Sequence, residues 1–290
     1  MDPTGTKAVV VTGVSTGIGW GTAQVLLARG FHVFGSVRKR EDAARLTEAW
    51  GARFTPLVFD ITDVDAVARG AREVAEALQG QTLFGLVNNA GIAVPGPLIH
   101  LDIADFRRQL EVNVVGALIV TQAFVGQLGA ERQRQGPPGR IVNVSSVGGK
   151  LGGPFLGAYC ASKFGLEGMS ESLRRELMLF GIDVIIVAPG AIATPIWDKA
   201  ESLDISVYAR TGYAAAAEHF QSASIADGRK GLPPEQVGEV IHTALTTRRP
   251  RTRYAVLRRP LLDWHLPRLL SFFDRRRVDT IVARRAGLLG

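Results

Sequence analysis

The stretch that decides the fold reads Thr12-Gly13-Val14-Ser15-Thr16-Gly17-Ile18-Gly19. It follows the apolar run Lys7–Thr12, whose consecutive valines are typical of a strand buried on both faces of a parallel sheet. It precedes a helical pattern from Gly17 to Arg29, which Gly30 ends. The three glycines let the backbone turn tightly and approach a pyrophosphate, and the helix aims its first N–H groups at that anion. A plain tight turn is the alternative interpretation of the same glycines.

Strands and helices alternate outward from this turn. The pattern predicts strands at 7–12, 32–37, 53–59, 83–88, 140–145 and 183–187, and helices at 17–29, 41–50, 63–79, 102–130 and 157–180. Such alternation indicates an α/β fold with a doubly wound, mainly parallel central sheet. No linker interrupts the series before about residue 190, so we expect a single domain.

The region 195–232 departs from this rhythm and predicts one or two short helices in a long insertion. A helix from Pro234 to about Thr247 and a last strand at Tyr254–Leu257 are expected after it. We therefore assign residues 1–250 to the domain and residues 251–290 to a basic C-terminal extension packed on or beside it.

Composition excludes several classes of protein. The chain has 290 residues, and its 46% hydrophobic content excludes disorder as the dominant state. The single cysteine excludes an internal disulfide framework and suits a reducing compartment, so we expect a cytoplasmic protein. None of the five histidines pairs at ligand spacing, so no metal site is expected. We find neither a transmembrane pattern nor a signal peptide.

The net charge of +7 is concentrated at the C-terminus. Residues 248–290 hold 12 Arg and 3 Asp, a net charge of +9, and the remaining residues together have a net charge of −2. The basicity therefore belongs to the tail, and no nucleic-acid partner is expected.

The end of the second predicted strand reads Ser36-Val37-Arg38-Lys39-Arg40. A dinucleotide fold that prefers NAD places a carboxylate there, to bind the ribose 2′-hydroxyl. Here no carboxylate precedes Glu41, and an arginine can hold a phosphate with two donors. We predict NADP(H) over NAD(H), with Arg38 as the leading contact to the 2′-phosphate. A solvated charge run at a helix start is the alternative.

The run Tyr159-Cys160-Ala161-Ser162-Lys163 places a phenol and an amine on one helix face. An ammonium group beside a phenol favours the phenolate and lowers the phenol pKa from about 10. Such a tyrosine exchanges a proton near neutral pH. The motif is short and recurs by chance in helices, so its meaning depends on the other motifs in the chain.

Taken in order, the motifs of this chain resemble those of the classical short-chain dehydrogenases/reductases, from about Lys7 to Thr247. The matching segments are Thr12–Gly19, Asp60 in Phe59–Thr62, Asn88–Gly91, Asn113 in Val112–Val114, Ser145-Ser146, Tyr159 with Lys163, and Pro189-Gly190 with Thr194. The resemblance implies a Rossmann fold and an enzyme that uses a nicotinamide cofactor.

The resemblance also implies four catalytic residues. Tyr159 would be the general acid in reduction and the base in oxidation, and Lys163 would bind the nicotinamide ribose and lower the pKa of Tyr159. Ser146 would bind the substrate carbonyl oxygen, and is preferred to Ser145 because the family's serine lies 13 residues before the tyrosine. Asn113 would hold a water that relays protons to Lys163.

The implied cofactor contacts come from the ends of five of the predicted strands and from the Tyr159–Lys163 helix. Asp60 and Ile61 would face the adenine, and Gly190, Ile192 and Thr194 would meet the nicotinamide. The full set is Gly13, Ser15, Thr16, Gly17, Ile18, Gly19, Arg38, Asp60, Ile61, Asn88, Ala90, Gly91, Tyr159, Lys163, Pro189, Gly190, Ile192 and Thr194.

The segments 33–38 and 159–168 look similar to the 17β-hydroxysteroid and retinol dehydrogenase-like branch. In those relatives a hydroxyl at the position of Ser15 or Thr16 also meets the 2′-phosphate. The insertion 195–232, called the lid below, would cover a bulky hydrophobic ketone or aldehyde. Its apolar walls would include Phe155, Trp197, Tyr208 and Tyr213, although ordinary core packing or an oligomer contact explains these aromatics equally well.

The implied function is an NADP(H)-dependent interconversion of a carbonyl and an alcohol on a small hydrophobic substrate. The alternative is a non-catalytic NADP-binding sensor or scaffold on the same fold. The family commonly associates through the helices near 102–130 and 157–180, so a homodimer or homotetramer is expected.

The tail 260–290 mixes arginines with apolar side chains and allows three interpretations. It packs on the surface of the domain, contacts a partner subunit, or lies on an anionic membrane, which would make the protein peripheral to that membrane. Pro260 and Pro267 break any helix there, which weakens the membrane interpretation.

The membrane interpretation predicts that the full chain co-sediments with liposomes and that a chain lacking 260–290 does not. A sedimentation assay of the two proteins measures this directly. Equal partition of both would exclude membrane contact through the tail.

Overall fold

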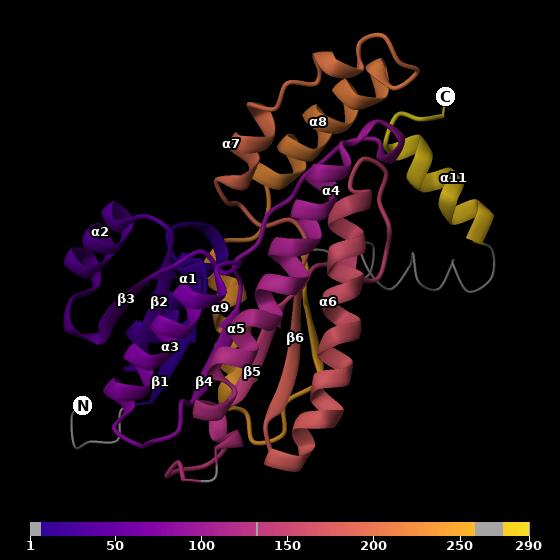
Figure 1. Cartoon of the computed structure of the whole chain (residues 1–290). Helices are drawn as coiled ribbons and strands as arrows, with labels where there is room; N and C mark the ends of the chain where they lie inside the picture. Colours follow the sequence, from indigo (N-terminus) through magenta and orange to yellow (C-terminus); the bar gives the residue numbers. More distant parts are fainter. Residues whose placement is uncertain (1–6, 132, 259–274, 290) are drawn as a thin grey trace.

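The computed structural model describes residues 7–131, 133–258 and 275–289. Its centre is a seven-stranded sheet in the order β3-β2-β1-β4-β5-β6-β7, with every neighbouring pair parallel (Figure 1). The strands are β1 (Ala8–Val11), β2 (His32–Val37), β3 (Phe54–Val58), β4 (Gly85–Asn88), β5 (Arg140–Val144), β6 (Asp183–Pro189) and β7 (Arg253–Val256). The strand order reverses between β1 and β4, which confirms the doubly wound fold and places a ligand crevice at their carboxyl ends.

Helices cover both faces of the sheet. The described helices are α1 (Gly17–Ala28), α2 (Arg40–Trp50), α3 (Val64–Leu78), α4 (Ile103–Leu110), α5 (Gly116–Phe124), α6 (Gly157–Glu176), α7 (Ile196–Glu201), α8 (Ala214–Arg229), α9 (Pro234–Thr246) and α11 (Arg275–Arg285). Helices α1, α2 and α9 pack on one face, and α3, α5 and α6 on the other. Helices α7 and α8 form the lid beyond the carboxyl edge of the sheet, with α11 beside it (Figure 1). None of the described helices is long and apolar enough to cross a membrane.

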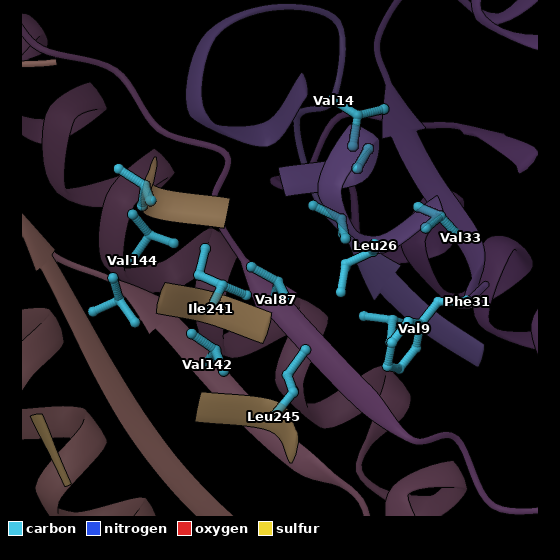
Figure 2. Packing of buried hydrophobic residues seen from close by; sticks show 14 of the residues in the cluster. Val9, Val14, Leu26, Phe31, Val33, Val87, Val142, Val144, Ile241 and Leu245 are labelled. Carbon is cyan, nitrogen blue, oxygen red and sulfur yellow. The ribbon is translucent and has the colours of Figure 1, made fainter. Parts of the chain in front are cut away.

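The core explains why the strands are continuously apolar. Successive side chains of a strand point to opposite faces, so Val9 faces α1 and α9 whereas Val10 faces α3 and α5. Figure 2 shows the first cluster, in which Leu26 of α1 and Ile241 of α9 meet the valines of the sheet. Each such side chain, fully buried, stabilises the fold by about 1.5–3 kcal/mol. Both sheet faces are therefore closed to water, and polar chemistry is confined to the strand ends.

The single helix expected over 102–130 is interrupted twice. One π-helical turn, Glu111–Val115, separates α4 from α5, and a second, Gly126–Ala130, follows α5 and contains Gly129 at φ 116°. A π turn inserts one residue into the helical repeat, which shifts the following side chains around the axis. Apolar periodicity does not reveal such an insertion, because both flanking segments keep their buried faces.

The last predicted strand forms within the main sheet. Residues Ile186 to Pro189 of β6 pair with Arg253 to Val256 of β7, so this segment is part of the sheet although the predicted boundary at residue 250 separates it from the domain. Residues 260–274 of the predicted extension lie outside the described residues. In the lid, α7 is short as expected, whereas α8 runs for 16 residues.

Candidate active site

The glycine-rich turn lies between β1 and α1, at the strand-order reversal. Gly13 and Gly17 have φ of 72° and 63°, a region that side chains with a Cβ rarely adopt. A Cβ on Gly13 would lie 3.0 Å from the Cα of Ala90, and a Cβ on Gly19 would overlap the carbonyl oxygen of Gly13. No side chain caps the N-terminus of α1, and no acidic residue lies in its first turn. The turn is therefore a backbone cradle that favours an anion.

Two side chains hold this cradle against β4. The Thr12 hydroxyl accepts hydrogen bonds from the backbone N–H groups of Asn89 (2.9 Å) and Ala90 (3.0 Å). The Asn89 amide donates to the carbonyl oxygens of Thr12 (2.9 Å) and Gly13 (3.2 Å). Asn89 was not among the predicted site residues, although it lies inside the Asn88–Gly91 motif.

Asn88 has a different place from the one expected. Its side chain is buried and donates to the Thr121 hydroxyl (3.0 Å) and the Asn143 amide oxygen (2.9 Å). Asn143 in turn donates to the Ser170 hydroxyl (2.8 Å). The Asn88 side chain thus links α5 to α6 beneath the strand ends, so its predicted place in the crevice can involve only its backbone.

The adenine side of the crevice is built around the end of β3. The Asp60 carboxylate is exposed and accepts hydrogen bonds from the backbone N–H (3.0 Å) and hydroxyl (2.8 Å) of Thr62. Ile61 is buried, and a Cβ on Gly116 would lie 2.9 Å from its side chain. The Asp60–Thr62 turn is therefore rigid, and Ile61 packs against α5.

Cations surround the rim of the cradle after β2. Arg38, Lys39 and Arg40 are all exposed. Arg45 of α2 donates to the carbonyl oxygen of Ser15 (3.1 Å) and to the Asp42 carboxylate (2.8 Å). Arg45 was not predicted as a site residue. Arg38 precedes α2 and Arg45 lies within it, so helical spacing does not relate the two residues and gave no signal for this contact.

The loop after β6 closes the opposite side of the crevice. The N–H of Gly190 donates to the carbonyl of Val256 (3.0 Å), which anchors the loop at Pro189 to β7. A Cβ on Gly17 would lie 3.4 Å from the Thr194 side chain, so Thr194 reaches the glycine turn. Ile192 is buried, and its carbonyl accepts a hydrogen bond from the Trp197 indole (2.7 Å). The predicted residues on the two sides of the crevice therefore meet, and a dinucleotide fits the glycine cradle with its pyrophosphate at α1.

Ser146, Tyr159 and Lys163 come together at the carboxyl edge of β5. Ser146 follows the strand and accepts a hydrogen bond from the N–H of Gly148 (3.1 Å). The Tyr159 and Ser146 side chains lie together at Gly148, where a Cβ would lie 3.4 Å from the Tyr159 ring and 3.5 Å from the Ser146 hydroxyl. The Lys163 ammonium lies 5.7 Å from the centre of the Tyr159 ring and donates to the carbonyl of Val144 (2.9 Å). This is the arrangement that the resemblance implied for an acid, a hydrogen-bond donor and a cation.

Asn113 lies in the first π turn and is fully engaged. Its amide oxygen accepts from the N–H of Ile92 (2.9 Å), and its amide nitrogen donates to the Ile92 carbonyl (3.0 Å) and the Ser162 hydroxyl (3.0 Å). Ser162 donates to the carbonyl of Tyr159 (2.7 Å), so Asn113 connects the 92–94 loop to the catalytic helix. Gln109, which sequence reasoning missed, also donates to the Ile92 carbonyl (2.9 Å). The spacing of Gln109 and Asn113 at i and i+4 in the helix predicted over 102–130 was the available signal.

The electrostatics of the tyrosine differ from the prediction. Burial raises the pKa of Tyr159, and the hydrogen bond from Ser146 opposes this only in part. The net pKa of Tyr159 is therefore raised, and the lowering expected from Lys163 stays a prediction. Burial also lowers the pKa of Lys163 itself, to about 8, with Glu167 acting in the opposite direction.

Aromatic side chains gather where the lid meets the start of α6. The Phe155 ring lies 5.0 Å from the Phe220 ring and 6.0 Å from the Tyr213 ring, and Tyr208 packs against the same cluster. The Trp197 ring instead packs on Gly228 of α8, so it belongs to the inside of the lid. At the other end of α8, His219 is hydrogen-bonded to the carbonyl of Arg285 (3.2 Å), which joins α11 to the lid.

A sequence model of the family described as short chain dehydrogenase matches residues 7–204. The chain belongs to this family. It is an oxidoreductase of the short-chain dehydrogenase type, whose fold binds a nicotinamide cofactor, and the family resemblance seen in its motifs is confirmed.

Two curated relatives cover most of the chain. The NADPH-dependent 3-dehydrocapnine reductase of Ornithobacterium rhinotracheale is 39% identical over 256 residues, which is 88% of this chain and 90% of that protein. Retinol dehydrogenase 5 of Homo sapiens is 37% identical over 270 residues, 87% of this chain and 81% of that protein. The likeness to the retinol dehydrogenase-like branch is thereby confirmed.

Solved structures share the fold. A short chain dehydrogenase from Burkholderia cenocepacia in complex with NADP aligns at a TM-score of 0.71 and 25% identity, covering 98% of each chain. A short chain dehydrogenase/reductase from Burkholderia phymatum in complex with NAD aligns at a TM-score of 0.76 and 22% identity, covering 94% of this chain and 96% of that one.

The lowered pKa of Lys163 predicts a pH-dependent stability. Between pH 8 and 10.5 the unfolded chain holds a proton on this amine that the folded protein has lost, so the free energy of unfolding rises with pH. Relative to Lys163→Met, the wild type should gain up to about 3 kcal/mol across this window. Urea unfolding of both proteins over the pH series measures the gain. Parallel pH profiles would mean that Lys163 keeps an ordinary pKa.

Proposed function

We propose that the protein is an NADP(H)-dependent oxidoreductase that interconverts a carbonyl and a primary or secondary alcohol on a bulky hydrophobic substrate. The observation that supports it best is the contact of Ser146, Tyr159 and Lys163 beside the glycine cradle. A carbonyl bound there would meet an acid and a hydrogen-bond donor on one side.

In the proposed mechanism, the bound cofactor supplies or accepts a hydride. In reduction, the Tyr159 hydroxyl gives its proton to the developing alkoxide, and the Ser146 hydroxyl donates a hydrogen bond to the same oxygen. In oxidation, Tyr159 accepts the proton of the alcohol. Burial raises the pKa of Tyr159, so the phenol is protonated at neutral pH and has a proton to give in reduction.

Lys163 and Asn113 act on this step without touching the carbonyl. The Lys163 ammonium would bind the nicotinamide ribose and offset the negative charge that forms on Tyr159 during proton transfer. Asn113 holds the 92–94 loop against the Tyr159 turn of α6 through Ser162. The residues thus fix the orientation of the acid before substrate arrives.

The preference for NADP(H) rests on the charge around the cradle. Arg38, Lys39 and Arg40 are exposed after β2, and Arg45 reaches Ser15 on the rim. An arginine fork suits the 2′-phosphate that distinguishes NADP from NAD. The relative named as an NADPH-dependent reductase supports the same choice.

The hydrophobic substrate class rests on the lid. Phe155 lies four residues before Tyr159, beside the start of α6, in a cluster that also contains Tyr208, Tyr213 and Phe220. Aromatic walls favour a large apolar ligand. The relative named retinol dehydrogenase 5 supports this class.

We propose a homodimer or homotetramer that uses the faces of α4 to α6. Exposed apolar side chains on and beside these helices are Ile103, Val115, Phe164, Met178 and Leu179. Light scattering measures the assembly, and a monomer would contradict it.

The membrane interpretation of 260–290 stays a prediction, since residues 260–274 lie outside the described part of the chain.

Turnover by the wild type and its loss in Tyr159→Phe test the function. We expect consumption of NADPH with ketosteroids, retinal, quinones or aryl ketones, and a fall in kcat of about 10²–10⁴-fold in the variant, because the phenol proton is lost. Cofactor binding, measured by fluorescence titration, should stay within a few-fold. Tight NADPH binding by a wild type that turns over no carbonyl or alcohol would favour the sensor alternative.

Arg38→Gln tests the cofactor preference. We expect the Kd for NADPH to rise about tenfold or more, because a charge-assisted contact to the 2′-phosphate is lost, and the Kd for NADH to stay nearly constant. Arg72→Gln, at an exposed arginine of α3, is the matched control and should change neither value. Equal weakening of both cofactors in Arg38→Gln would contradict the assignment.

A further inference from the structure

A buried carboxylate lies on the catalytic helix below the tyrosine and lysine. Glu167 lies four residues after Lys163 and eight residues after Tyr159, so all three side chains share one face of α6. Glu167 is 1% exposed. A glutamate is almost never this buried unless it is paired, so its partners indicate what it does.

The carboxylate joins three segments to α6. Its oxygens accept a hydrogen bond from the Ser145 hydroxyl (3.0 Å) and form ion pairs with Arg253 of β7 (3.0 Å) and Lys150 (3.2 Å). Arg253 also donates through Nε to both carboxylate oxygens, at 3.2 Å each. Glu167 is therefore the common partner of the end of β5, the loop behind it and β7.

The loop that contains Ser146 packs directly on this carboxylate. A Cβ on Gly149 would lie 2.7 Å from both the Glu167 oxygen and the Ser145 hydroxyl. The same segment presents the Val144 carbonyl that accepts from the Lys163 ammonium. The placement of the catalytic serine and of the lysine thus depends on one buried anion.

The Glu167 carboxylate favours the ammonium form of Lys163. Lys150 and Arg253 approach Glu167 from the loop and from β7, and Tyr159 and Lys163 lie above it on α6. Burial drives Lys163 toward the neutral amine, and Glu167 opposes this. If Glu167 lost its negative charge, Lys150 and Arg253 would disfavour the ammonium form of Lys163 with no Glu167 carboxylate to offset them.

We propose that Glu167 is a positioning residue of the active site, which holds the Ser145–Lys150 segment on α6 and keeps Lys163 an ammonium at working pH. The inference rests on the proposed roles of Tyr159 and Lys163. Lys150, which forms an ion pair with the carboxylate, offsets part of its charge, so Glu167 and Lys150 act on Lys163 in opposite directions.

This opposition gives the test. The chain has six lysines, at 7, 39, 150, 163, 199 and 230, so NMR of lysine-labelled protein resolves them, and Lys163→Met assigns the Lys163 signal. In Glu167→Gln the pH midpoint of Lys163 should fall by about one unit, because a nearby opposite charge is lost while the side-chain shape is kept. In Lys150→Met it should rise by a few tenths of a unit, because a half-exposed like charge is lost.

The outcomes are distinct. A purely structural role would leave the midpoint unmoved or shift it in the same direction in both variants, and either result overturns the proposal. Glu167→Asp restores the charge and should return the midpoint most of the way to the wild-type value. Lys150 is a surface-accessible position, so Lys150→Met alone decides the sign if Glu167→Gln does not fold.

The alkaline limb of kcat/KM for reduction should move with the midpoint in each variant. A wild type without turnover would contradict the proposed function, whereas the NMR midpoints would still test the role of Glu167 independently. Midpoints that shift as expected while the alkaline limb stays fixed would overturn the link between Glu167 and catalysis.

Discussion

The hydrogen bonds between Thr12 and Asn89 tie the carboxyl ends of β1 and β4 together at the point where the strand order reverses. The strands of the sheet are parallel, so their carboxyl ends lie along this edge. Beyond it, the backbone N–H and C=O groups no longer pair with a neighbouring strand. Apolar helices cover both faces of the sheet and leave no other place for polar chemistry. The glycine cradle is held in place at this seam.

Tyr159 and Lys163, the proposed catalytic pair, lie in an environment that disfavours their charged forms. Burial lowers the pKa of Lys163 and raises that of Tyr159, so the ionised forms of both are costly. The Val144 carbonyl, the Ser146 hydroxyl and the Glu167 carboxylate offset part of this cost. A site organised in this way needs little rearrangement when charge develops on the substrate oxygen.

Much of the fold was predictable because it depends on local patterns. The valine runs, the glycine turn after the first strand and the β–α alternation led to a doubly wound sheet, and the strand bounds differ from those observed by only one or two residues for most strands. The π turn at Asn113 was not predictable, because the apolar pattern continues through it. The side chain of Asn88 was misplaced for a similar reason, since an Asn-Asn pair does not say which member turns inward.

The sequence by itself determined the β–α alternation and the glycine turn after the first strand, because both depend on local patterns. The group of Ser146, Tyr159 and Lys163 was expected from the resemblance of the ordered motifs to the family. Only the tertiary structure decided the electrostatics. Desolvation depends on everything packed around a group, and the partners of Glu167 come from β5, its following loop and β7, up to 86 residues away. Spacing on one helix predicts which side chains share a face, but the packing of distant segments sets their charge.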